Sequence, residues 1–169
     1  KDFVVADPDS DNRGLTVALL RGSFEYQGQK CSAASRAYIP RSVWASISSE
    51  LCEEVGKITM GDARDFTNFM TAVIDQRAID KITGYISRAA GSSSSEIIVG
   101  GGYDDSKGWF IEPTIIVTND PNSETMVEEI FGPVLTVYVY DDDDFESTLE
   151  ICDQASPYAL TGSIFANNE

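Results

Sequence analysis

Val134-Leu135-Thr136-Val137-Tyr138-Val139-Tyr140 decides the fold class, together with the two segments that follow it. The run is rich in β-branched and aromatic residues and its odd-numbered side chains are apolar, which is typical of a strand. A helical pattern follows over Phe145–Ala155, and a second strand pattern covers Gly162–Ala166. A strand, a helix and a strand in this order predict two parallel strands joined by a crossover helix.

The same alternation of strand and helix extends towards the amino end of the chain. The patterns predict short strands and amphipathic helices in turn, with Ser42 as the N-cap of one helix and the serines after Gly91 as a loop. The remaining strands are expected over 37–39, 97–99 and 114–118, and the remaining helices over 15–22, 42–55 and 78–90. The sequence therefore predicts an α/β domain with a largely parallel sheet.

Charge is the unusual feature of the composition. The 169 residues include 42% hydrophobic and 24% charged side chains, as in an ordinary globular protein, but the formal net charge is −16 and histidine is absent. Beyond residue 100, Lys107 is the only basic residue against 15 acidic ones. Nucleic acid and anionic membrane surfaces are therefore not expected as partners, because both require basic patches. No apolar run is long enough to cross a membrane.

The three cysteines, Cys31, Cys52 and Cys152, are widely separated and odd in number. They argue against a disulfide framework or a zinc site and favour a reducing compartment. Cys52 lies beside the apolar face of its helix and is expected to be a small buried residue. The run Asp141–Asp144 lacks the glycine and the spaced ligands of a calcium loop, so no metal is expected there. A solvated loop that opens the next helix is the favoured interpretation.

The segment around Cys31 is the first candidate for chemistry. The thiol stands in Gly28-Gln29-Lys30-Cys31-Ser32, where a helix is expected to end and a strand to begin. Its small neighbours leave room for a substrate, and the amine of Lys30 would favour the thiolate if it pointed inward. Because histidine is absent, any activating base is a carboxylate or water. These residues alone leave open an inert cysteine or a nucleophile.

Three ordered motifs point to a family. Gly28-Gln29-Lys30-Cys31-Ser32, Gly108-Trp109-Phe110-Ile111-Glu112-Pro113-Thr114 and Glu128-Glu129-Ile130-Phe131-Gly132-Pro133-Val134 resemble the characteristic segments of the aldehyde dehydrogenase superfamily. The separation of about a hundred residues between Cys31 and Phe131 is similar too. Within the superfamily, Phe24–Ala33 looks most like the branch that oxidises glutamate γ-semialdehyde, the open form of pyrroline-5-carboxylate.

The resemblance implies a fold, a reaction and a site. The fold would be a three-layer catalytic domain covering residues 1–169, with the nucleotide-binding domain outside this chain. Cys31 would attack the aldehyde, hydride would pass from the thiohemiacetal to NAD+, and hydrolysis of the thioester would give glutamate, a reaction of proline catabolism. Ser32 would bind the substrate carboxylate. Glu129 would accept hydrogen bonds from the nicotinamide ribose, and Phe131 would pack beside the nicotinamide.

The resemblance also implies partners. Lys1 looks like the lysine that follows the general-base glutamate and two glycines, and the chain starts without Met, so those residues are expected in a longer enzyme. That enzyme would be a homo-oligomer that acts on a small aldehyde in the mitochondrial matrix, or otherwise in the cytoplasm. The chain alone would have little or no activity. Positive charge for substrate and pyrophosphate would come from elsewhere, with Lys30 and Arg36 nearest.

Two other interpretations remain. The chain would be the catalytic domain of a dehydrogenase for another aldehyde, or an inactive acidic binding module that retains the fold.

Overall fold

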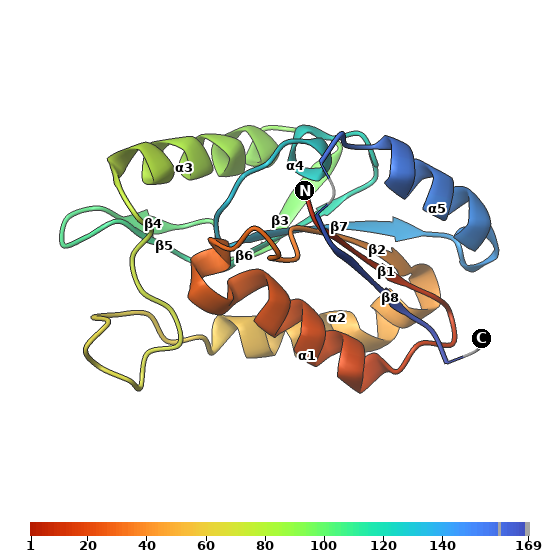
Figure 1. Cartoon of the computed structure of the whole chain (residues 1–169), viewed down its shortest axis with the longest axis horizontal. Coiled ribbons are helices and arrows are strands. Elements are labelled where there is room, and N and C mark those ends of the chain that lie inside the picture. Colours follow the sequence, from red (N-terminus) through yellow and green to blue (C-terminus); the bar gives the residue numbers. More distant parts are fainter. Residues whose placement is uncertain (159, 168–169) are drawn as a thin grey trace.

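A six-stranded sheet forms the middle layer of the molecule (Figure 1). The computed structural model describes residues 1–158 and 160–167. The strands are ordered β3-β6-β7-β2-β1-β8, and a two-stranded hairpin, β4–β5, stands apart from them. Strand β3 runs antiparallel to β6, whereas the other neighbours in the sheet are parallel. The sheet is therefore mixed but mostly parallel, as the sequence predicts.

Helices and strands alternate along most of the chain. In order, the elements are β1 (Phe3–Ala6), α1 (Asn12–Phe24), the short turn η1 (Glu25–Gly28), β2 (Arg36–Pro40), α2 (Arg41–Gly56), α3 (Gln76–Ala90), β3 (Ser95–Val99), β4 (Tyr103–Asp104), β5 (Phe110–Ile111), β6 (Thr114–Thr118), α4 (Glu124–Val127), β7 (Val134–Tyr140), the 3₁₀ turn η2 (Asp142–Asp144), α5 (Phe145–Gln154) and β8 (Gly162–Phe165).

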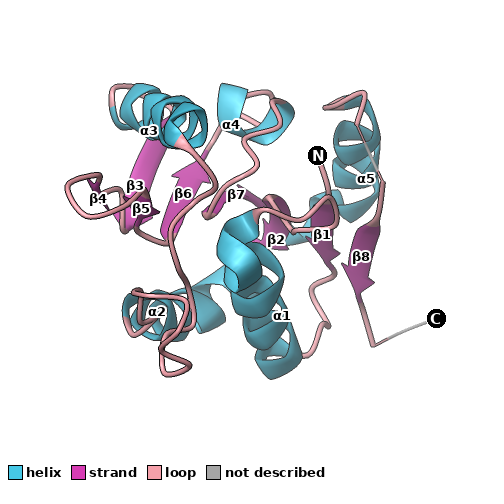
Figure 2. Ribbon diagram, turned by 60° about the vertical axis from the view of Figure 1, so that its left-hand side comes forward, coloured by secondary structure: helices cyan, strands magenta, loops and turns pink. Residues whose placement is uncertain are grey.

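The helices cover the two faces of the sheet and make three layers. Helices α1 and α2 lie on one face, and α3, α4 and α5 lie on the other (Figure 2). The apolar stripe of α2, with Ile47, Leu51 and Val55, packs with α1 against the central strands. On the opposite face, α3 contributes Ile79, Ile82 and Ile86 to a second cluster. Apolar side chains on both faces explain why β7 is buried along most of its length.

Strands β6 and β7 have the bounds that their sequence patterns predict, and the other predicted elements shift by one to three residues. The prediction that Ser42 caps a helix is wrong. Helix α2 begins at Arg41 with Pro40 in the N-cap position, and the backbone N–H of Ser42 donates to the carboxylate of Asp142 at 3.1 Å. The capping oxygen comes from η2, so no pattern local to Ser42 contains it.

Candidate active site

The motifs around Cys31 and Phe131 meet at the side of the sheet where the parallel strands β2 and β7 begin. Strands β2 and β7 are parallel neighbours in which Arg36 pairs with Thr136. Cys31 lies five residues before Arg36, and Phe131 lies five residues before Thr136. The two loops that precede these strands therefore approach the same place, although a hundred residues of chain separate them.

A left-handed turn forms the start of the Cys31 loop. Tyr26, Gln27 and Gly28 have φ angles of 56°, 59° and 64° in succession. A Cβ atom at Gly28 would collide with the carbonyl oxygen of Gly132. Glycine is therefore required at this position both by its backbone conformation and by the close approach of the second loop. The contact between Gly28 and Gly132 joins the two motifs.

Cys31 and Ser32 lie on an exposed turn between η1 and β2. Of the other thiols, Cys152 is buried, whereas Cys52 is half-buried and so less enclosed than its sequence pattern predicts. Burial raises the pKa of both of these thiols. The Nζ atom of Lys30 pairs with the Glu25 carboxylate at 2.9 Å. The structure therefore gives no support to thiolate activation by Lys30.

Glu129 and Phe131 lie in the loop between α4 and β7. The Glu129 side chain is 39% exposed, and one of its oxygens is 3.1 Å from the backbone nitrogen of Lys1. Phe131 has a φ of 60°, which is unusual for a residue with a large side chain, and the residue is 42% exposed. An acceptor carboxylate and an exposed aromatic ring two residues apart fit the ribose and nicotinamide end of NAD.

Lys1 lies beside Glu129 in a buried position. Its side-chain amine has no hydrogen-bond partner among the described residues. Desolvation lowers the pKa of this amine to about 7, although the charge of Glu129 acts in the opposite direction. Lys1 therefore brings a second titratable group to the edge of the sheet that carries the motifs.

Helix α3 was not assigned any role from the sequence, yet it supports both loops. Lys81 donates from its Nζ atom to the backbone carbonyl of Glu129 at 2.6 Å. The Ile82 side chain occupies the space where a Cβ atom of Gly132 would lie. Asp75 begins the helix by accepting from the N–H of Ala78 at 2.8 Å. The sequence signal was present in the isoleucine stripe, but nothing in that stripe identifies what it packs against.

The third motif is tied to the same region through the backbone. The backbone carbonyl of Trp109 accepts from the N–H of Val73 at 2.8 Å. The indole N–H of Trp109 donates to the side-chain oxygen of Gln76 at 3.1 Å. Trp109 is partly exposed, and Ile74, next to Val73, is 77% exposed. All three motifs are therefore linked to one another, directly or through the segment that leads into α3.

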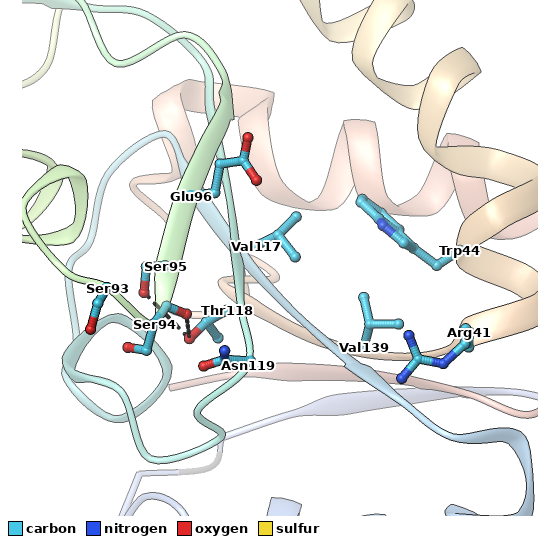
Figure 3. A pocket seen from close by; sticks show the side chains of 10 residues that line it. All are labelled: Arg41, Trp44, Ser93, Ser94, Ser95, Glu96, Val117, Thr118, Asn119 and Val139. Carbon is cyan, nitrogen blue, oxygen red and sulfur yellow. Dashed lines mark hydrogen bonds between the residues drawn. The ribbon is translucent and has the colours of Figure 1, made fainter.

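A cavity of about 570 Å³ lies at the opposite, carboxyl edge of the sheet (Figure 3). Val117 and Val139 form its floor between Trp44 on α2 and Glu96 on β3. Arg41 is paired with Asp141 at 2.7 Å, and the Thr118 hydroxyl donates to the Ser94 carbonyl at 3.0 Å. The cavity contains none of the motif residues and its main polar groups are already paired, so it is not the candidate site.

Two kinds of feature are absent from residues 1–158 and 160–167. Within this part of the chain, no group of three or more acidic, cysteine or histidine side chains is placed to hold a metal ion. No helix there is long and apolar enough to cross a membrane.

Comparisons with known proteins agree with these motifs. The family model described as "Aldehyde dehydrogenase family" matches residues 1–169. The mitochondrial delta-1-pyrroline-5-carboxylate dehydrogenase of Dictyostelium discoideum is 55% identical over 166 residues, which cover 98% of this chain and 30% of that protein.

Solved structures share the fold. The Mycobacterium tuberculosis delta-pyrroline-5-carboxylate dehydrogenase bound with NAD has a TM-score of 0.92 and 45% identity, over 99% of this chain and 30% of its own. The lactaldehyde dehydrogenase of Escherichia coli has a TM-score of 0.90 and 26% identity, over 99% of this chain and 34% of its own. The chain thus spans about a third of the length of these proteins. A family match over the whole sequence, together with relatives of this identity, shows that the chain belongs to the aldehyde dehydrogenase family.

Proposed function

We propose that the chain is the catalytic, thiol-bearing part of an NAD-dependent dehydrogenase that oxidises glutamate γ-semialdehyde, the open form of pyrroline-5-carboxylate, to glutamate. The observation that carries this proposal is the contact between Gly28 and Gly132, which brings the Cys31 turn next to the loop of Glu129 and Phe131. The 55% identity to a pyrroline-5-carboxylate dehydrogenase supports the choice of substrate.

In this proposal the chain's own residues carry out the following steps. Cys31, exposed on its turn, attacks the aldehyde carbon as a thiolate and forms a thiohemiacetal. The backbone N–H of Cys31 stabilises the oxyanion that develops on the aldehyde oxygen. NAD+, when bound, accepts the hydride. Water then releases the acyl group from the Cys31 sulfur, which is a good leaving group at the thioester stage.

Glu129 and Phe131 orient the cofactor in this proposal. The carboxylate of Glu129 accepts from the ribose hydroxyls, and the exposed ring of Phe131 lies against the nicotinamide. Lys81 holds the Glu129 backbone from α3, so the position of the carboxylate is set by a helix rather than by the loop alone. Ser32 donates to the carboxylate of the substrate.

The remaining parts of the proposal concern the whole enzyme. A nucleotide-binding domain in the rest of the enzyme supplies the adenosine and pyrophosphate site, because the described edge of the sheet offers an acceptor for ribose but little free positive charge for phosphate. The whole enzyme is a homo-oligomer. Its location is the mitochondrial matrix, a proposal supported by the several relatives that are named mitochondrial.

A chimera tests the reaction. In it, this chain replaces the matching segment of the Dictyostelium discoideum relative, and NADH formation from pyrroline-5-carboxylate is measured. We expect turnover in the chimera, a loss of about 1,000-fold or more in Cys31→Ser, and little change in the matched control Cys52→Ser. A folded chimera without turnover, or equal rates for the two variants, would contradict the proposal.

The substrate is tested in the same chimera with Ser32→Ala. Removal of a hydrogen bond to a carboxylate is expected to raise KM for pyrroline-5-carboxylate by about tenfold or more, and to leave KM for an aldehyde without a carboxylate unchanged. Equal effects on both aldehydes would favour a dehydrogenase for another substrate.

A further inference from the structure

The side chains of Gln27 and Gln29, in the Cys31 turn, form hydrogen bonds with the backbone of residues 71–74. The Oε1 atom of Gln27 accepts from the N–H of Thr71 at 3.0 Å, and its Nε2 atom donates to the carbonyl of Ala72 at 3.4 Å. The Oε1 atom of Gln29 accepts from the N–H of Ile74 at 3.0 Å. Gln27 is buried, so solvent competes only partly for its two bonds, whereas the bond between Gln29 and the exposed Ile74 is open to solvent.

The backbone of the segment bound by these glutamines needs hydrogen-bond partners from other parts of the chain. Residues 57–75, all of them described, contain no helix or strand, and only a single bridge joins Met60 to Met70. Its backbone groups therefore lack the partners that regular structure would provide. The glutamine amides satisfy the N–H groups of Thr71 and Ile74 in place of a neighbouring strand.

The segment continues directly into α3, which supports the second loop. Asp75 caps α3, Lys81 binds the carbonyl of Glu129, and Ile82 packs against Gly132. Gly132 in turn contacts Gly28, next to both glutamines. The Cys31 turn therefore contacts segment 71–74, which leads into α3, and α3 contacts the Glu129 loop. The contact between Gly28 and Gly132 joins that loop back to the Cys31 turn.

We propose that Gln27 and Gln29 are positioning residues, which fix the Cys31 turn to α3 and so set the position of the thiol relative to Glu129. The assignment rests on the proposed function only for its effect on catalysis. The mechanical part concerns the order of the Cys31 turn and does not depend on any reaction. A shift of about 1 Å between reacting groups lowers a rate by about 100-fold, so the turn needs such support.

The variants exploit the fact that Gln29 uses only its acceptor atom. Gln29→Met removes the bond to Ile74 at similar side-chain length, whereas Gln29→Glu keeps an acceptor oxygen. Gln154, exposed at the end of α5, provides the matched control Gln154→Met. Thermal unfolding of each variant verifies that the chain still folds.

The first measurement uses the 169-residue chain with a nitroxide attached to Cys31. We expect Gln29→Met to increase the mobility of the nitroxide and to speed hydrogen exchange at the Ile74 amide by about tenfold. Gln29→Glu and Gln154→Met are expected to behave like the unchanged chain. Unchanged mobility and exchange in a folded Gln29→Met chain would overturn the proposal, as would equal effects of Met and Glu.

The second measurement uses the chimera. Gln29→Met is expected to lower kcat by about 10- to 100-fold with little change in the Kd for NAD, and Gln29→Glu to recover most of the rate. A pH–rate profile separates this recovery from any effect of the new charge on the Cys31 thiol. A mobile turn with unchanged kcat would overturn the catalytic part. An inactive chimera would instead contradict the proposed function, and the nitroxide result would still decide whether the glutamines position the turn.

Discussion

The three thiols differ in environment, which makes the state of Cys31 measurable. Cys31 is exposed, whereas burial both shields Cys152 and raises the pKa values of Cys52 and Cys152. We therefore expect limited iodoacetamide treatment to label Cys31 first, Cys52 next and Cys152 last. Mass mapping of the alkylated peptides checks the order. Labelling of Cys52 before Cys31 would contradict the exposed placement of the Cys31 turn.

The buried amine of Lys1 is expected to make the stability of the chain depend on pH. Burial lowers the pKa of its amine from 10.5 to about 7 in the folded chain. Between these two values the unfolded chain binds one more proton than the folded chain, so the free energy of unfolding rises with pH by up to about 1.4 kcal/mol per unit. Urea unfolding from about pH 7 to about pH 9 should show this rise, and Lys1→Met should flatten it.

The thiols of Cys52 and Cys152 and two tyrosines limit the pH window of that measurement, because burial raises the pKa of each of these groups. Burial raises the pKa values of Tyr38 and Tyr140 above their ordinary value of 10. Their contribution to stability is lost as the pH rises above that ordinary value, because the unfolded chain then ionises while the folded chain does not. A slope of equal size in Lys1→Met would contradict the assignment to Lys1.

At this scale the sequence predicted roles for single residues, which stay predictions, but it did not predict the contacts that connect them. The motifs around Cys31 and Phe131 lie on two segments that meet in the fold through Gly28 and Gly132. The conditional role of Lys30 receives no support from the structure, because its amine pairs with Glu25, which precedes the left-handed turn. The contacts of Gln27 and Gln29 depend on a segment more than 40 residues away, and no local pattern contains that information.

Among the elements, α3 has the largest role that the sequence did not predict. Gly132→Ala would place a methyl group against Ile82, a fully buried side chain of α3. We expect the variant to lower the free energy of unfolding by about 1–3 kcal/mol. Urea unfolding measures this loss. The double variant Gly132→Ala, Ile82→Val should lose less than the sum of its two single changes, since valine leaves room for the added methyl group.

Gly56→Ala provides the matched control for that experiment. Gly56 lies at the end of α2 with no atom near the position of an added Cβ. Its substitution should leave stability unchanged or slightly raised. Strictly additive losses in the double variant would show that Gly132 and Ile82 do not share the space described.

Local patterns predicted the elements well where one residue type repeated. Strands β6 and β7 and the apolar faces of α2 and α3 follow directly from periodicity. The start of α2 was missed because Asp142, a hundred residues away, caps it. Part of the aspartate run thus orders a helix, which the solvated-loop interpretation did not anticipate.

The whole molecule is expected to be a poor catalyst by itself. The contact between Gly28 and Gly132 brings together the loops that carry Cys31, Glu129 and Phe131, but these side chains are exposed to water. We expect the 169-residue chain to show little or no turnover of pyrroline-5-carboxylate with NAD+ in a steady-state assay, because catalysis of this type requires a closed site. Turnover comparable to that of the chimera would contradict this expectation.

The fold class was predictable because the order of strands and helices restricts the possible topologies. The strand order β3-β6-β7-β2-β1-β8 was not, since it depends on which distant strands pair. The antiparallel placement of β3 also escaped prediction, because its short apolar run looks the same in either direction.

The equal spacing on β2 and β7 has a consequence for tolerance to insertions. Cys31 lies five residues before Arg36, and Phe131 lies five residues before Thr136, the residue with which Arg36 pairs. The lengths of the two connecting segments therefore set where Cys31 and Phe131 lie. One residue inserted into either connecting segment, within 32–35 or 132–133, would displace Cys31 or Phe131 while leaving the strands of the sheet intact. An insertion into residues 61–69, beyond the reach of Gln27 and Gln29, would be absorbed as a longer loop. Single-residue insertions made in turn at these places should therefore be tolerated within residues 61–69 but not in the segments 32–35 and 132–133, which precede strands β2 and β7.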